Sequence, residues 1–353
     1  MLLSVGEPAP WFRAATASEP EFAFDRAAGR YVLLAFLPLD DAGRGAALQA
    51  LAANQGMFDA GRLAVFVVVR DPETAASVRD ISALRWIIDL DRQVSRLFDR
   101  PDGDGMGAPA WMILDPTLRV FAFGGLEHTE AVFRRLAGLP AVADHAAAPL
   151  HAPVLTVPRI LEPELRQRLI AVHQADGGAF TGVMRDQGDR TVAVMDELKR
   201  RRDILVRDPE LVALLRDRLE RRLFPLIHRG LGFTVTRVER YLVSCYDADD
   251  GAVFHAHRDS TTHATAHRKF ACSLNLNDDF VGGDLRFPEF GPSTYRPPAG
   301  GAVVFSCTLM HEARPVTQGR RYALLPFFYD EAGAAVLAAY QERTAPTAEA
   351  ISE

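Results

Sequence analysis

The sequence contains few cysteines, three in 353 residues. Cys245, Cys272 and Cys307 are dispersed, form no C-x-x-C pair and lack the spacing of a thiolate zinc site. Each lies in an apolar, strand-like stretch, which is typical of a small buried hydrophobic side chain. The sequence therefore predicts neither a disulfide framework nor a cysteine-bound zinc ion.

The chain also lacks a long apolar segment. No run approaches the roughly 20 apolar residues that a membrane span requires. The N-terminal MLLSVGEPAP has no charged segment followed by an apolar core, as a signal peptide would. We therefore expect a cytoplasmic protein with no membrane partner.

A basic charge excess is absent as well. The formal net charge is -6 and the isoelectric point is near 6.0, so no global field attracts nucleic acid. The one basic run, Lys199–Arg202, is followed directly by Asp203 and is predicted to be a solvated surface. Neither a Gly-rich phosphate loop nor a G-x-S-x-G turn occurs, which removes two common classes of enzyme from consideration.

Length and composition indicate two domains. With 353 residues, 48% of them hydrophobic, the chain is long for a single core. The stretch GLPAVADHAAAPLHAPVL is rich in Ala and Pro and has no periodicity. We predict domains at residues 1–137 and 156–335, a linker at 138–155 and a C-terminal tail at 336–353, whose final stretch QERTAPTAEAISE is polar and expected to fray.

The first domain alternates strand and helix patterns. YVLLAFLP and LAVFVVV are continuous apolar runs, typical of strands covered on both faces of a sheet. The segment between them, GRGAALQALAANQGMFDAG, has the pattern of a helix, and PAWMILD with VFAFGG predicts a hairpin. The fold class of residues 1–137 is therefore α/β.

The stretches VGEPAPWF, GRYVLLAFLP and GAPAWMILDPTLRVFAF resemble the redoxin branch of the thioredoxin fold. The resemblance implies a cis-proline at Pro109. Redoxin chemistry requires a cysteine of low pKa after the first strand, but this chain reads LDDAGRG there and has no cysteine before Cys245. We expect a thioredoxin-like domain without a redox centre, in a structural or partner-binding role.

The second domain opens with helices and continues with strands. ILEPELRQRLIAVHQA and DPELVALLRDRLERRLFPLI carry leucines at helical spacing, and Asp208 is a candidate N-cap. From residue 234 the period changes to two in VERYLVSCY, FACSLNLN, GDLRF, AVVFSC and RYALLPFFY. Short strands separated by glycine turns predict an antiparallel barrel or sandwich.

Candidate metal ligands lie in FHAHRDS. In a regular strand His255, His257 and Asp259 share one face and Phe254 lies on the other. A later strand, AVVFSCTLMH, ends at His311. Two imidazoles and one carboxylate are typical of non-haem Fe(II) oxygenases.

Other polar residues accompany this group. Arg321 follows a glycine turn, and its guanidinium suits a carboxylate of a dicarboxylate ligand, whereas Arg320 should face the opposite side. Asn275 faces the metal side, where it would contact the same dicarboxylate ligand, if Leu274 and Leu276 face the core outside the barrel; a plain sheet-surface position stays open. We further consider a substrate contact or a solvated position for Arg286, and a substrate lid or a surface loop for the segment with His263 and His267.

In these residues the chain resembles the prolyl-4-hydroxylase-like branch of the 2-oxoglutarate- and Fe(II)-dependent dioxygenases over roughly residues 152–331. The matching stretches are ERYLVSCYDADDGAVFHAHRD, FACSLNLNDDFVGGDLRFPEFG and GGAVVFSCTLMHEARPVTQGRRYALLPFFYDE. The resemblance implies an α+β domain with a double-stranded β-helix (jelly-roll) core. It implies Fe(2+) ligands at His257, Asp259 and His311, and contacts to 2-oxoglutarate from Arg321 and Tyr246. His255 is then a neighbour of the site or of the substrate.

The function implied is hydroxylation of a C–H bond with 2-oxoglutarate and O2 as cosubstrates and ascorbate as a candidate reductant. Retention of Asp259 favours hydroxylation, while desaturation and ring formation stay open. The substrate would be a peptide or protein side chain, an amino acid or a small natural product. The alternatives are an inert binding or scaffold protein and a zinc hydrolase, although no general-base glutamate adjoins the ligands. A homodimer stays open.

Overall fold

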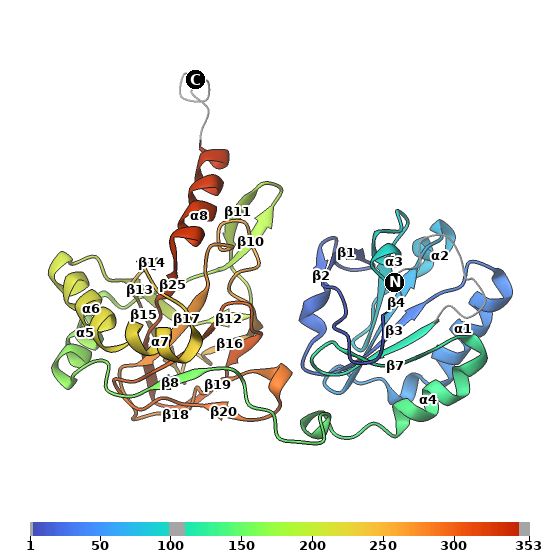
Figure 1. Cartoon of the computed structure of the whole chain (residues 1–353), viewed down its shortest axis with the longest axis horizontal. Helices are drawn as coiled ribbons and strands as arrows, with labels where there is room; N and C mark the ends of the chain where they lie inside the picture. The colour runs from blue at the N-terminus through green and yellow to red at the C-terminus, as the bar shows by residue number, and fades with distance from the viewer. Residues whose placement is uncertain (1–2, 99–109, 346–353) are drawn as a thin grey trace. The chain divides into compact units, whose positions relative to one another are not determined.

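The computed structural model describes residues 3–98 and 110–345, so Pro109 lies outside the described residues. Two compact units are present: Met1–His151 with Pro288–Pro292, and Ala152–Phe287 with Ser293–Glu353. Figure 1 shows their elements. Within the described ranges, none of the helices combines the length and apolarity needed to cross a membrane.

The first unit is built on a mixed sheet. Its order is β2 (Phe22–Ala23), β1 (Arg13–Thr16), β5 (Leu84–Ile88), β4 (Leu63–Val69), β3 (Tyr31–Phe36), β6 (Trp111–Leu114) and β7 (Val120–Gly124). Strand β4 pairs in parallel with β3 and β5, and the remaining pairs are antiparallel. The apolar runs seen in the sequence are these central strands, and the β6–β7 hairpin is confirmed.

Both faces of this sheet are covered. Helices α1 (Asp41–Ala53) and α4 (Thr129–Ala137) pack on one face against alternate residues of β3 and β4. The other face carries a cluster of phenylalanines, including Phe24, Phe66 and Phe98, with α2 (Pro72–Ser77) and α3 (Gln93–Leu97) completing the unit. The α/β class is confirmed, since two-sided burial explains the continuous apolar runs; the likeness to thioredoxin stays a prediction.

Replacing Phe133 of α4 by alanine is expected to lower the free energy of unfolding of the first unit by about 3–5 kcal/mol. The ring is 5% exposed and contacts Trp111 edge-on at 5.4 Å between centroids. The matched control is Phe123→Ala on β7, whose ring is 47% exposed and which should change stability by about 0.5 kcal/mol or less. Calorimetric unfolding of both variants checks this; equal losses would contradict the packing described.

The larger sheet of the second unit is antiparallel. Its path is β14 (Arg237–Val238), β25 (Phe327–Tyr329), β17 (Phe270–Asn275), β24 (Arg320–Leu324), β15 (Leu242–Asp247), β13 (Arg202–Leu205) and β9 (Ala179–Phe180). Off this path, β21 (Ala302–Ser306) pairs with β17 and β8 (Leu155–Val157). One face is thereby presented to helices and the other to a second sheet.

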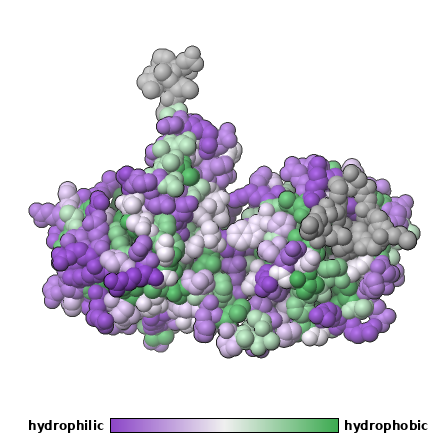
Figure 2. Space-filling view, viewed as in Figure 1, coloured by the Kyte–Doolittle hydropathy of each residue, from purple (hydrophilic) through white to green (hydrophobic). Residues whose placement is uncertain are grey.

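Helices α5 (Pro163–Asp176), α6 (Pro209–Arg222) and α7 (Phe224–Leu231) pack on one face of the larger sheet (Figure 1). Asp208 caps α6 as predicted, since its side chain accepts from the backbone N of Leu211 at 2.7 Å. The outward surface around α5 and α6 is largely hydrophilic (Figure 2). All three cysteines are free and buried, as predicted.

The smaller sheet of the second unit has the order β12 (Lys199–Arg200), β16 (Val253–His257), β22 (His311–Ala313), β19 (Leu285–Arg286) and β20 (Thr294–Tyr295). The ring of Phe305 on the larger sheet lies 4.5 Å from the ring of His311 on this one. The two sheets therefore face each other, in agreement with the predicted antiparallel barrel or sandwich. Two short pairs complete the unit, the hairpin of β10 (Val183–Gln187) and β11 (Arg190–Val194) and the pair of β18 (Val281–Gly282) and β23 (Val316–Gln318).

The predicted tail from residue 336 is partly wrong. Helix α8 runs from Glu331 to Thr344, and Asp330 caps it by accepting from the backbone N of Gly333 at 2.8 Å. The cap and the alanine-rich composition of the first turns favour a helix where the polar end of the segment suggested fraying.

Candidate metal centre

Three side chains meet between the two sheets. His257 ends β16, Asp259 follows it, and His311 opens β22 directly opposite His257 in the strand register. One possible ligand atom from each lies within 4.8 Å of the others. Asp259 Oδ1 is 3.5 Å from His257 Nε2, and Oδ2 is 3.3 Å from His311 Nε2. Among residues 3–98 and 110–345 this is the one such group able to hold a metal.

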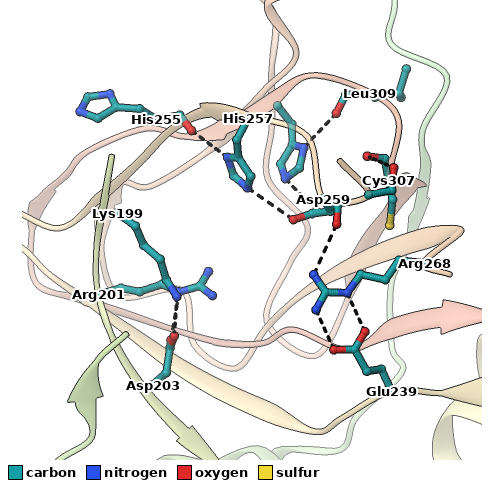
Figure 3. Close-up of polar contacts among 12 residues, drawn as sticks. Lys199, Arg201, Asp203, Glu239, His255, His257, Asp259, Arg268, Cys307 and Leu309 are labelled. Carbon is teal, nitrogen blue, oxygen red and sulfur yellow. Dashed lines mark hydrogen bonds and ion pairs between the residues drawn. The ribbon is translucent and has the colours of Figure 1, made fainter. Parts of the chain in front are cut away.

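Backbone carbonyls orient both imidazoles (Figure 3). His257 Nδ1 lies 2.7 Å from the carbonyl O of His255, and His311 Nδ1 lies 3.1 Å from that of Leu309. A carbonyl accepts, so each Nδ1 carries a proton, and each Nε2, which faces Asp259, is the nitrogen available to a metal. This tautomer is the one that a metal ligand needs.

The charge states fit a divalent cation as well. Burial, and then the nearby His257, lower the pKa of His311 to about 4, so its ring is neutral at pH 7. Burial alone would raise the pKa of Asp259, but His311 and His257 outweigh it and hold that pKa well below its usual value. Two imidazoles and one carboxylate match the facial set typical of non-haem iron.

The predicted strand alternation at this site is wrong. The register of β16 against β22 shifts between Phe254 and His257, an irregularity that reorients the side chains. The ring of Phe254 consequently stacks on that of His257 with centroids 3.5 Å apart. His255 is exposed and its ring points away from the metal group, so only its carbonyl serves the site (Figure 3).

Arg321 lies beside this group, on the inner face of the larger sheet. The side chain is fully enclosed, with Nε donating to Asn275 Oδ1 at 3.0 Å and Nη2 to Ser273 Oγ at 2.6 Å. Its Nη1 is buried and has no hydrogen-bond partner among the residues that the structure describes. Burial lowers the pKa of Arg321, because an enclosed cation without a neighbouring anion is less stable than one in water. A carboxylate supplied by a ligand would satisfy it.

Asn275 and Tyr246 share this inner face. Leu274 and Leu276 belong to the apolar cluster under the helices, so Asn275 lies on the other side of the sheet, as the conditional prediction required. Tyr246 is the direct register partner of Arg321, and the Arg321 Cζ lies 5.2 Å from its ring centroid. Arg320 faces outward and pairs with Asp247 at 2.6 Å, as expected.

The predicted solvated surface at Lys199–Arg202 is wrong for two of its members. Lys199 and Arg201 are enclosed and both pair with the buried Asp203, at 3.0 and 2.9 Å. Burial and the charge of Arg201 lower the pKa of Lys199 to about 8, against the opposing effect of Asp203. The sequence contained a sign of this pairing: the charged residues 199, 201 and 203 are spaced by two, which places them on one face of an extended segment.

Arg286 is not brought to the metal group. It pairs with Glu312 at 3.0 Å, and Glu312 alternates with His311 along β22, so both lie on the opposite face of the smaller sheet. The predicted substrate contact from Arg286 therefore has no support in the geometry.

A buried ionic cluster adjoins Asp259. Glu239 accepts from Arg268 at 2.6 and 2.8 Å and contacts His267 Nε2 at 3.0 Å. Arg268 Nη1 also reaches the carbonyl O of Asp259 at 3.4 Å (Figure 3). His267 is thus a buried partner of a carboxylate. The loop before it contacts the hairpin of β10 and β11, because His263 N donates to the Asp186 carboxylate at 3.1 Å.

Replacing Glu239 by glutamine is expected to remove a pH-dependent part of stability. Burial would raise the pKa of Glu239, but hydrogen bonds from His267 and Arg268 lower it from 4.5 to about 2. The ionised form thus stabilises the fold above about pH 4.5, on the order of 3 kcal/mol, and this contribution fades as the pH falls toward 2. The difference between wild type and variant should therefore shrink on acidification, as urea unfolding at several pH values would measure. Glu331→Gln is the control: its exposed ion pair with Arg237 also lowers the pKa of Glu331, but solvent screens that contact, so this variant should change the pH profile far less. A constant difference for Glu239→Gln would contradict the assignment.

Comparison with known proteins agrees with this site. Residues 241–329 match the family model described as 2OG-Fe(II) oxygenase superfamily. A PKHD-type hydroxylase from Polaromonas sp. (strain JS666 / ATCC BAA-500) is 29% identical over 197 residues, which is 50% of this chain and 78% of that protein. Another, from Synechococcus sp. (strain JA-2-3B'a(2-13)), is 27% identical over 122 residues, or 31% of this chain and 54% of that protein.

The chain spans about half the length of the first curated relatives that it matches. Among solved structures, a Pseudomonas putida prolyl-4-hydroxylase is similar with a TM-score of 0.40 and 20% identity, covering 55% of this chain and 97% of that one. The family match includes all three residues of the metal group and Arg321. Residues 241–329 of the second unit are therefore similar to the 2OG-Fe(II) oxygenase superfamily, whose members use Fe(II), 2-oxoglutarate and O2.

Proposed function

We propose that this protein is an Fe(II)- and 2-oxoglutarate-dependent dioxygenase that hydroxylates an unactivated C–H bond. The observation that carries the proposal is the buried Arg321, whose Nη1 has no partner among the described residues although its other nitrogens are held by Asn275 and Ser273. A hydrolase that uses a metal alone leaves such a cation unexplained, whereas a dicarboxylate cosubstrate satisfies it.

Separate residues of the site would bind the metal and the cosubstrate. His257, Asp259 and His311 would hold the iron, and the carbonyls behind the two imidazoles fix their orientation. Arg321 and Tyr246 would bind the carboxylate of 2-oxoglutarate that lies away from the metal. Fe(II) held with 2-oxoglutarate supplies the oxidation of a C–H bond by O2, with release of succinate and CO2.

The proposed substrate is a peptide or protein side chain, an amino acid or a small natural product. The relatives named PKHD-type hydroxylases support hydroxylation as the outcome. Asp259 supports it too, because a carboxylate at this position completes the protein ligand set. Product mass would separate hydroxylation, which adds one oxygen, from desaturation or cyclisation, which removes two hydrogens.

Anaerobic addition of Fe(II) and 2-oxoglutarate to the metal-free protein tests the proposal without a known substrate. A weak visible charge-transfer band should appear only when both are present. Fe(II) alone and 2-oxoglutarate alone are the controls. No band, together with no measurable binding of either component, would favour an inert scaffold.

A further inference from the structure

Arg201 is held at two points inside the second unit. Its Nη1 donates to Tyr246 Oη at 2.7 Å, and its Nε lies 2.9 Å from Asp203 Oδ1. Its guanidinium also lies 5.3 Å from the centroid of Phe254, the ring that stacks on His257. Arg201 thereby connects the metal group with the inner face that carries Tyr246.

The anion behind Arg201 is firmly fixed. Asp203 accepts from Ser244 Oγ at 2.5 Å and from Lys199 Nζ at 3.0 Å, and Thr181 Oγ1 also donates to it. Because this carboxylate is tied to three other groups, it is a fixed counter-ion for the Arg201 guanidinium, whose Nε pairs with it by charge without forming a hydrogen bond. A planar guanidinium can lie against this carboxylate and still donate to the phenol, whereas a lysine ammonium acts as a point charge.

The contact with Arg201 restricts the hydroxyl of Tyr246. A phenol has one proton to donate, and a guanidinium offers no acceptor. Since Arg201 donates to Tyr246 Oη, the Tyr246 proton must be directed elsewhere. No protein acceptor for it occurs among the hydrogen bonds of residues 3–98 and 110–345, and the side chain is 2% exposed. A buried donor without an acceptor is a group that awaits a ligand.

The neighbour of this hydroxyl on the same sheet face is Arg321. The two residues are direct register partners on β15 and β24, so their side chains point to the same side. Within the described part of the chain, Tyr246 O–H and Arg321 Nη1 are then both donors without protein acceptors. Two such donors on one sheet face, one of them charged, match a carboxylate.

We propose that Arg201 is a positioning residue for the cosubstrate: by donating to Tyr246 Oη it commits the Tyr246 proton to the 2-oxoglutarate carboxylate that Arg321 binds. This inference rests on the proposed function. In the wild type the orientation of the Tyr246 O–H bond is fixed before the ligand binds. Without Arg201 the Tyr246 proton is free to turn away, and part of the hydrogen bond to the carboxylate is lost.

A double-mutant cycle on the full chain tests the proposal. The anaerobic Kd of 2-oxoglutarate would be measured with Mn(II) in place of Fe(II), so that no turnover is needed, together with the Mn(II) affinity of each variant. Tyr246→Phe should weaken 2-oxoglutarate binding by about tenfold or more, the worth of a hydrogen bond to a charged group. Arg201→Gln should weaken it by about threefold or more, but by less than Tyr246→Phe does, because only part of that hydrogen bond is lost, and should leave the Mn(II) affinity unchanged.

Coupling is the decisive readout. In the Tyr246→Phe background, Arg201→Gln should add less than about a twofold loss, because the hydroxyl that it orients is gone. Arg201→Lys, which keeps a cation beside Asp203, preserves the test if Arg201→Gln does not fold, and the same non-additivity is expected. Arg202→Gln is the matched control, since Arg202 pairs with Asp250 and is much more exposed; it should bind 2-oxoglutarate like the wild type.

Two results would overturn the inference alone. One is wild-type affinity in both Arg201 variants. The other is a loss on Arg201→Gln that is equally large with and without the Tyr246 hydroxyl, which would mean that Arg201 acts directly through its charge. If the wild type itself failed to bind 2-oxoglutarate, the proposed function would fall and this inference with it.

Discussion

Replacing His257 by alanine is expected to abolish iron-dependent turnover and to weaken Fe(II) binding by more than about 100-fold. Mutation of residues that only support a metal ligand already changes metal affinity by about 10- to 100-fold. His257 is itself one of the three candidate ligands, and its Nε2 faces Asp259. Binding of Mn(II) or Fe(II) to the anaerobic protein, followed by calorimetry, gives the measurement. Asp259→Ala and His311→Ala should behave in the same way.

The neighbouring histidine provides the matched control. His255→Ala should keep most of the metal affinity and measurable activity, because the site uses the backbone carbonyl of residue 255 and the exposed ring points away. Loss of metal binding in both variants would mean that the ligand set is not His257, Asp259 and His311.

Arg321→Ala is expected to weaken 2-oxoglutarate binding by about 30- to 700-fold while sparing the metal. Removing one partner of a buried charged contact costs about 2–4 kcal/mol, which corresponds to that range of Kd. The variant should still bind Fe(II), and the visible band of the complex should require much more 2-oxoglutarate. Spectroscopic titration under argon would report both quantities.

Arg320→Ala is the control for Arg321. The two arginines are adjacent on β24, but Arg320 is exposed and pairs with Asp247 outside the site. Its loss should change the 2-oxoglutarate affinity by less than about twofold. An unchanged affinity in Arg321→Ala would remove the main support for the proposed cosubstrate, whatever Arg320→Ala did.

Much of the fold follows from local pattern. The apolar runs of β3 and β4 are buried on both faces, and the period-two segments after residue 234 form antiparallel sheets. The metal group could be proposed from the sequence because only a few residue types bind a metal, and His257, Asp259 and His311 belong to them. Arg321 could be proposed in the same way, as one of two basic residues that open an otherwise apolar strand.

The failures have a common cause. Strand alternation assigned Phe254 and His255 to the wrong faces. One register shift in β16 changes which face of the sheet each of the following side chains occupies. Lys199 and Arg201 were assigned to the surface because their anion, Asp203, becomes a buried partner only when β13 enters the larger sheet. Arg286 was considered for the site although its partner Glu312 holds it on the outer face.

The sequence by itself determined the classes of the two units, the metal-binding residue types and the arginine suited to a carboxylate, because each depends on periodicity or on residue chemistry that is local to a segment. The tertiary structure decided which face each polar side chain occupies, which cations are buried, and that Arg201 donates to Tyr246. Those outcomes depend on pairing between strands far apart in the chain, and hydrogen-bond partners exist only once that pairing is made.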